Sequence, residues 1–279
     1  MLKTIILLTG ATRQHRALAA LLQEHNPDLS FRCALTLDVL TGIESDVLRH
    51  ARLVSFTSGV IAPGAVLRQL GHGAYNFHPG PPQYPGWAPA HFALYDNAQI
   101  FGATAHAMEV RVDSGPIVGV ESFAIPENIS VRELEQIAFE RLAHLFWRMS
   151  RELAREPGAL SALPVAWSGN KSTKRMYREL CEIPAGVSAA ELKRRIRAFD
   201  DDFRGVPLTV TLHGPALPPL RPGSASCRAA ANRCPSDRDC VIAAAHSAGM
   251  IVKTTVIRLP PALCPAQDAR PRPVPGTRV

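Results

Sequence analysis

The run Gly73-Ala74-Tyr75-Asn76-Phe77-His78-Pro79-Gly80-Pro81-Pro82 begins as a buried strand and ends in a turn that no strand can continue. Three prolines within four residues offer no backbone N–H to a neighbouring strand. Asn76 and His78 are two residues apart, so their side chains project from the same face of the strand. A polar pair at the carboxyl end of a buried strand is where open α/β sheets bind ligands. This stretch therefore predicts both the class of fold and the place of the site.

Strand and helix patterns alternate on both sides of this run. The expected strands are Leu2–Leu8, Phe31–Leu37, Leu53–Ser58, Gly73–His78, Thr104–Val110 and Ile117–Phe123. The expected helices are Arg16–Glu24, Ile43–Arg49, Pro63–Leu70, Pro89–Asn97 and Val131–Ala154. This alternation favours an α/β fold whose sheet is mostly parallel, at least at first.

The chain is expected to have three parts, with residues 1–165 forming the α/β domain. Residues 166–214 form a short extension with one helix, Ser188–Phe199, and one strand, Leu208–Leu212, which could begin a barrel-like subdomain. Residues 215–279 form a Pro/Arg/Cys-rich tail that has no aromatic residue and contributes +6 of the net charge of +7. Such a composition predicts a disordered, basic tail. The change after Gly214 is abrupt enough to suggest out-of-frame translation of the tail.

Composition and spacing argue against several classes of protein. The body of the chain is nearly neutral, which argues against a wide phosphate-binding surface. The longest apolar run, Val241–Val252, is well short of the roughly 20 residues that a membrane span needs, so no membrane partner is expected. No convincing cleavable leader follows Met1, and the cytoplasm is the expected location. The cysteines have no C-x-x-C spacing, so no metal site is expected.

A third polar residue, Asp113, lies in the turn Val112-Asp113-Ser114-Gly115-Pro116 that follows the strand Thr104–Val110. If the two strands are neighbours, Asn76, His78 and Asp113 meet in one crevice. An amide N–H stabilises an oxygen that gains negative charge, and histidine moves a proton near neutral pH. A carboxylate nearby favours the imidazolium. This set suits attack on a carbonyl carbon, although each residue taken alone could instead be an ordinary turn or core residue.

Three motifs then resemble one known family. They are Asn76-Phe77-His78-Pro79-Gly80-Pro81-Pro82-Gln83-Tyr84-Pro85-Gly86, Gly102-Ala103-Thr104-Ala105-His106, and Val112-Asp113-Ser114-Gly115-Pro116-Ile117-Val118. In this order they resemble the folate-dependent formyltransferases. The resemblance implies a Rossmann-like formyltransferase domain that moves the formyl group of N10-formyltetrahydrofolate, a co-substrate, to a primary amine without a metal. It also implies that Asn76, His78 and Asp113 are the catalytic residues.

The same resemblance indicates binding residues. The backbone of Gly59, Val60 and Ile61 matches a segment that holds the pterin ring in members of the family, and His106 and Val112 are expected on the cofactor side. Tyr84, Trp87 and Lys171 are expected to bind the substrate. Each has a plainer interpretation: His106 can be a packed strand residue, aromatics of a Pro-Gly loop often pack on the body, and Lys171 can belong to a solvated basic turn.

The acceptor is less clearly indicated. Residues Trp167-Ser168-Gly169-Asn170-Lys171-Ser172-Thr173-Lys174 and Glu191–Phe199 look most like the sugar N-formyltransferases. The resemblance thus implies a nucleotide-linked amino sugar as the small-molecule acceptor. A methionyl-tRNA formyltransferase is the alternative, and tRNA is disfavoured because the tail cannot complete the C-terminal barrel of those enzymes. A formyltetrahydrofolate deformylase and an inactive binding relic are further alternatives. The sequence does not decide the oligomeric state.

Overall fold

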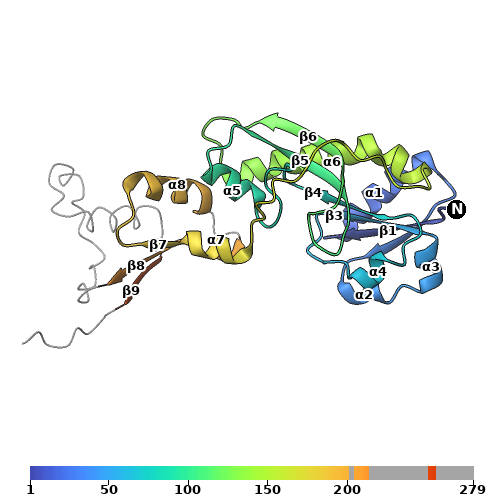
Figure 1. Cartoon of the computed structure of the whole chain (residues 1–279), viewed down its shortest axis with the longest axis horizontal. Helices are drawn as coiled ribbons and strands as arrows, with labels where there is room; N and C mark the ends of the chain where they lie inside the picture. The colour runs from blue at the N-terminus through green and yellow to red at the C-terminus, as the bar shows by residue number, and fades with distance from the viewer. Residues whose placement is uncertain (201–203, 214–250, 256–279) are drawn as a thin grey trace, which may run out of the picture.

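A six-stranded sheet forms the centre of the computed structural model, which describes residues 1–200, 204–213 and 251–255 (Figure 1). Its strands, in spatial order, are β2 (Ser30–Ala34), β1 (Thr4–Thr9), β3 (Ala51–Phe56), β4 (Ala74–His78), β5 (Ile100–Ala107) and β6 (Ile117–Ala124). The first four are parallel, and β5 and β6 run antiparallel to their neighbours. The predicted α/β class with a mostly parallel sheet is confirmed.

Helices cover both faces of this sheet (Figure 1). One face packs against α1 (Thr12–His25) and α6 (Val131–Arg155), with Val54 and Phe56 of β3 in that core. The opposite face packs against α2 (Leu37–Thr41), α3 (Ser45–Arg49) and α4 (Gly64–Leu67), with Leu53 of β3 in that core. Successive residues of β3 thus enter opposite cores, because side chains alternate along a strand and both faces of a parallel sheet are buried.

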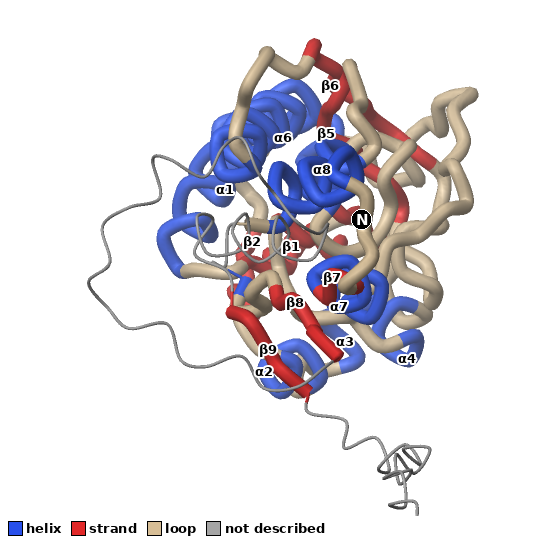
Figure 2. The backbone as a smooth tube through the Cα atoms, turned by 90° about the vertical axis from the view of Figure 1, so that its left-hand side faces the viewer, coloured by secondary structure: helices blue, strands red, loops and turns tan. Residues whose placement is uncertain are grey.

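A second, smaller layer lies beyond the carboxyl ends of the parallel strands, at the left in Figure 1, and it faces the viewer in Figure 2. It contains α5 (Pro89–Tyr95), α7 (Lys174–Cys181), α8 (Ala189–Phe199), β7 (Glu182–Pro184), β8 (Thr209–His213) and β9 (Ile251–Thr255). Tyr177 and Phe199 lie in a core that these helices share with the first turns of α6. The three strands are parallel, in the order β7-β8-β9.

Several predicted bounds were wrong, for local reasons. The expected strand Phe31–Leu37 ends at Ala34, because the Thr36 side chain accepts a hydrogen bond from the Val39 N–H at 3.3 Å and so caps α2. The basic turn expected around Lys171 continues into α7, which Thr173 caps in the same way. The strand expected at Thr104–Val110 is instead Ile100–Ala107.

The expected division at residues 165 and 214 stays a prediction. Most of the predicted tail, 215–250 and 256–279, lies outside the described residues. Its short strand β9 was not foreseen. None of the described helices is both long enough and apolar enough to cross a membrane.

A fully buried arginine links the sheet to the last turn of α6. Arg52 of β3 is 0% exposed and donates hydrogen bonds to the carbonyls of His72 (3.0 Å), Leu153 (2.7 Å) and Gly158 (2.7 Å). Burial lowers the pKa of this guanidinium. The Leu153 carbonyl lies in the last turn of α6, where carbonyl groups have no N–H donor within the helix. Arg52 therefore supplies a donor to an acceptor that would otherwise be buried and unpaired.

Candidate active site

Asn76 and His106 are directly opposite each other in the antiparallel pair β4–β5. Their side chains share one face of the sheet, and the Asn76 Nδ2 lies 3.1 Å from the His106 Nε2. The His106 Nδ1 lies 2.8 Å from the Ala107 carbonyl oxygen, which can only accept, so Nδ1 carries a proton. The His106 Nε2 lies between the Asn76 amide and the Asp113 carboxylate. The second N–H of the Asn76 amide remains for another acceptor.

Asp113 approaches the same point from the loop between β5 and β6. Its backbone φ is +48°, in the left-handed region, and its side chain is buried. The Gly86 N–H donates to its Oδ2 at 2.8 Å, and its Oδ1 lies 3.3 Å from the His106 Nε2. Burial by itself raises the pKa of Asp113, but the hydrogen bond to His106 and the charges of His78 and His106 outweigh it and lower the pKa to about 2. Asp113 is therefore a carboxylate near neutral pH.

His78 closes the group at the end of β4. Its Nε2 donates to the Tyr84 carbonyl at 3.1 Å, and its Nδ1 lies 3.9 Å from the Asp113 Oδ2, too far for a direct hydrogen bond. Burial lowers the pKa of His78, which Asp113 partly opposes. The neutral ring thus keeps its proton on Nε2 and has a lone pair on Nδ1, on the side of the carboxylate.

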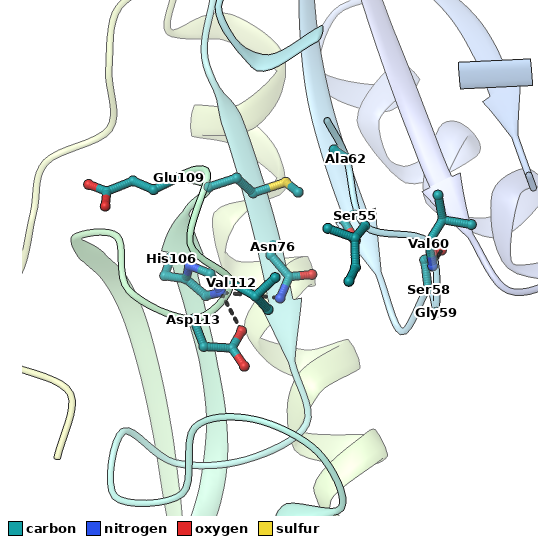
Figure 3. Close-up of a pocket in the computed structure, with 12 residues that line it drawn as sticks. Ser55, Ser58, Gly59, Val60, Ala62, Asn76, His106, Glu109, Val112 and Asp113 are labelled. Carbon is teal, nitrogen blue, oxygen red and sulfur yellow. Dashed lines mark hydrogen bonds and ion pairs between the residues drawn. The ribbon is translucent and has the colours of Figure 1, made fainter. Parts of the chain in front are cut away.

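A cavity of about 90 Å³ opens beside these residues (Figure 3). Of the predicted site residues, its walls include Asn76, His106, Asp113, Gly59, Val60, Ile61 and Val112. Figure 3 shows the loop with Gly59 and Val60 across from Asn76, His106 and Asp113. Pockets for whole drug-sized ligands usually hold roughly 300–1,000 Å³. This one can therefore enclose the reactive end of a ligand while the rest lies along the surface.

Sequence reasoning missed five further wall residues, namely Ser55, Ser58, Ala62, Met108 and Glu109. A signal existed for one of them. Ser55 is a polar residue near the carboxyl end of an otherwise apolar strand, and in the sheet it is the partner of Asn76. Two neighbouring parallel strands that each end with a polar residue on one face indicate a shared site at that edge.

Four predicted residues do not line this cavity: His78, Tyr84, Trp87 and Lys171. The Tyr84 ring lies 6.4 Å from that of Phe101, and the Trp87 ring lies 4.8 Å from that of Tyr177, both within the second layer's core. Lys171 donates from Nζ to the Val112 carbonyl at 2.8 Å. Binding of substrate by Tyr84, Trp87 and Lys171 stays a prediction.

A second, larger cavity of about 410 Å³ lies on the α6 side of the same sheet edge. Thr57 and Pro79, which follow β3 and β4, line it together with Arg132, Glu135 and Arg204. Glu135 and Arg204 form an ion pair. The carboxyl ends of β3 and β4 thus lie between two cavities. The small one contains the site residues Asn76, His106 and Asp113, and the larger one has the charged side chains of Arg132, Glu135 and Arg204 in its walls. Within the described ranges, no group of three or more His, Cys, Asp or Glu side chains could hold a metal ion.

Known proteins are similar to this chain in sequence and in fold. The family model described as formyl transferase matches residues 52–146. A methionyl-tRNA formyltransferase of Herminiimonas arsenicoxydans is 32% identical over 161 residues, 56% of this chain and 50% of that protein. The chain therefore spans half the length of this curated relative.

Solved structures support the same fold. A Mycobacterium tuberculosis protein with a proposed sugar N-formyltransferase activity aligns with a TM-score of 0.58 at 24% identity, over 73% of this chain and 90% of its own. An N-formyltransferase of Helicobacter canadensis, in complex with folinic acid and dTDP-3-aminofucose, aligns with a TM-score of 0.53 at 14% identity, over 75% and 83%.

The family model and the solved structures thus point to one class: residues 52–146 resemble the formyl transferase family, and the fold is that of the solved relatives. The resemblance to the folate-dependent formyltransferases is confirmed, and this chain is a relative of those enzymes.

Proposed function

We propose that this protein transfers the formyl group of N10-formyltetrahydrofolate to a primary amine. The observation that carries the proposal is the meeting of Asn76, His106 and Asp113 at one cavity, at the carboxyl ends of the sheet strands. The Asn76 amide can donate an N–H to an oxygen that becomes negative, and the Asp113 carboxylate is held beside the imidazoles of His78 and His106. Together these groups can stabilise a tetrahedral intermediate. We also propose the cytoplasm as its location.

In the proposed reaction the amine attacks the formyl carbon, and the bond from that carbon to N10 then breaks. The Asn76 amide donates to the carbonyl oxygen while it is negative. The proton that the amine loses moves to the lone pair on the His78 Nδ1, where Asp113 stabilises the resulting imidazolium. The same proton then leaves with N10 of tetrahydrofolate, so His78 returns to its neutral form and no covalent intermediate forms on the enzyme.

The formyl donor fits the small cavity. Its walls combine the backbone of Gly59–Ile61 with apolar side chains, which suits the edge and face of a flat heterocycle. In this proposal His106 and Val112 contact the donor near its formyl group. The relative from H. canadensis was solved with folinic acid, a formylated folate, which supports a donor of this chemistry.

The acceptor we propose is a nucleotide-linked amino sugar, bound through the second cavity. The cavity walls hold two arginines, Arg132 and Arg204, against one carboxylate, Glu135, and this excess of positive charge suits a diphosphate. Thr57 and Pro79 connect it to the strand ends that carry the catalytic group. Residues 1–214 have a net charge of only +1, which is little for a protein that must bind tRNA. Methionyl-tRNA remains the second candidate, because the H. arsenicoxydans relative has that name.

One assay tests the reaction and the acceptor together. The purified protein is incubated with N10-formyltetrahydrofolate and either a panel of nucleotide-linked amino sugars, charged initiator tRNA, or no acceptor. We expect tetrahydrofolate to form only with an amino sugar present. Formate released without any acceptor would instead identify a hydrolase, and formylation of tRNA alone would identify the second candidate. No turnover in any arm, together with no folate binding by calorimetry, would refute the proposal.

A further inference from the structure

Residues 167–172, here called the strap, cross the outside of the candidate site after the chain leaves α6. The strap is bound to both loops that carry the site. Its hydrogen bonds run from the Trp167 Nε1 to the Gly115 carbonyl (2.9 Å), the Ser168 N to the Pro82 carbonyl (3.0 Å), the Lys171 Nζ to the Val112 carbonyl (2.8 Å) and the Ser172 N to the Pro85 carbonyl (3.0 Å). The strap therefore joins the loop after β4 to the loop that presents Asp113.

The indole of Trp167 contacts both histidines of the site. Its ring centroid lies 5.9 Å from that of His78, at an interplanar angle of 74°, and 5.0 Å from that of His106, at 86°. Both contacts are of the edge-to-face kind that aromatic rings prefer. Trp167 itself is half-buried, and its neighbours in the chain from 161 to 166 are exposed. A ring from an exposed segment thus covers two buried imidazoles.

We propose that Trp167 is a positioning residue of the formyl transfer: its ring fixes His78 and His106 and keeps water from them, and its N–H fixes the loop of Asp113. The inference rests on the proposed function, because it concerns the same site. Trp167 acts through the two imidazoles and the carboxylate. Lys171, which binds the carbonyl of the residue before Asp113, fixes the same loop from the other end of the strap.

The proposal predicts a particular effect on His78. The charged and titratable groups that face His78 are Asp113, His106 and Lys171, and burial is the main cause that lowers its pKa. Without the indole, water reaches the ring, so the pKa of His78 should rise toward its ordinary value of 6.5. In the proposed mechanism His78 must start neutral. The acidic limb of the rate profile should therefore move to higher pH.

Two substitutions separate the ring from the N–H. Trp167→Phe keeps an aromatic cover and loses the hydrogen bond to Gly115, whereas Trp167→Ala loses both. Trp147→Phe and Trp147→Ala are matched controls, since Trp147 is 58% exposed on α6 and stacks on His144, away from the cavity. The readouts are the NMR titration of the His78 imidazole, assigned with a His78→Gln spectrum, and kcat and KM as functions of pH.

We expect Trp167→Ala to raise the His78 midpoint by about 1 unit, a fraction of the 3–5 units that full burial can cause. Its kcat should fall at least tenfold, with KM for the folate changed less than threefold. Trp167→Phe should keep the midpoint and lose about tenfold in kcat, the size of one hydrogen bond. The Trp147 variants should match the wild type in both readouts.

An unchanged His78 titration in folded Trp167→Ala overturns the proposal, whatever the rate. If Trp167→Ala does not fold, the test rests on Trp167→Phe. A kcat of Trp167→Phe equal to that of the wild type would overturn the proposed role of the indole N–H. The titration needs no turnover. A wild-type protein without formyl transfer therefore refutes the proposed function and still leaves the contact of Trp167 with His78 measurable on its own.

Discussion

The backbone N–H of Gly86 donates to the Asp113 Oδ2 at 2.8 Å, although the two residues lie in separate loops on opposite sides of β5 in the chain. Gly86 can do so because it adopts a φ of +101° and passes against the backbone of Ser172. Any side chain at this position would collide with the Ser172 carbonyl. Gly86 therefore allows the loop after β4, the loop that carries Asp113 and the strap to come together.

Gly86→Ala should destabilise the protein by about 2 kcal/mol or more, because alanine at a left-handed φ costs roughly 1–2 kcal/mol before the collision is counted. Chemical denaturation measures the loss. Gly186→Ala is the matched control, because nothing lies within 4 Å of its added Cβ, and it should stay within about 0.5 kcal/mol of the wild type. Equal stability of the two variants would contradict the close approach described here.

Asn76→Ala should lower kcat by about 10²–10³, the usual cost of losing one oxyanion donor, while folate binding stays within a few-fold. Steady-state kinetics and calorimetry measure the two effects. Gln69→Ala removes an exposed amide that donates to the Ala65 carbonyl of the preceding helix α4, and it should have the activity of the wild type. A kcat of Asn76→Ala within threefold of the wild type would refute the role of this amide.

Because of Asp113, the free energy of unfolding should fall at acidic pH. Its pKa in the folded protein is about 2, below the ordinary 3.8, so its stabilising effect is complete above pH 4 and is lost as pH falls toward 2. At 1.36 kcal/mol per unit the effect is about 2 kcal/mol. Between pH 5 and 2 the wild type should therefore lose about 2 kcal/mol more than Asp113→Asn does. Parallel curves for the two proteins, measured by denaturation at each pH, would contradict the ion pair with the histidines.

Arg52→Met should cost about 3 kcal/mol, because it leaves the buried Leu153 carbonyl and the part-buried carbonyls of His72 and Gly158 without this donor. The comparison is Arg49→Met, whose guanidinium is exposed and pairs only with the exposed Asp46 at 2.9 Å. That variant should lose less than about 1 kcal/mol. Similar midpoints in a thermal melt would show that Arg52 does not stabilise the end of α6.

The sequence was sufficient for those parts of the site that strand periodicity places. Asn76 and His106 share a face because alternation puts them there. Periodicity does not place Asp113: β5 runs antiparallel to β4 and ends beside the start of β4, and the loop after β5 returns to bring Asp113 to His106 and Gly86. The loop Gly59–Ile61 follows a parallel neighbour, so its position at the cavity was also predictable. These inferences need only the pleat of a strand and the common edge of a sheet.

Contacts made by long excursions of the chain were not predictable. Trp167 reaches His78 only because residues 156–166 return along the sheet, and no local pattern determines that path. The state of His78 also escaped sequence reasoning. Its Nε2 donates a hydrogen bond to the Tyr84 carbonyl, so the Nδ1 offers the lone pair to which the proposed reaction assigns the amine proton. Tyr84 and Trp87 pack into the second layer's core, which composition cannot distinguish from a binding surface.

Because Asn76 and His106 face each other across a ladder of main-chain hydrogen bonds, their mutual distance does not depend on either flanking loop. Segments from other acceptor classes could thus be grafted at the start of α6, which lines the proposed acceptor cavity, and leave Asn76 and His106 undisturbed. The β4–β5 pair would keep its geometry when the acceptor-binding segments are exchanged, so variants with new acceptor specificity could be selected without changes at Asn76 and His106.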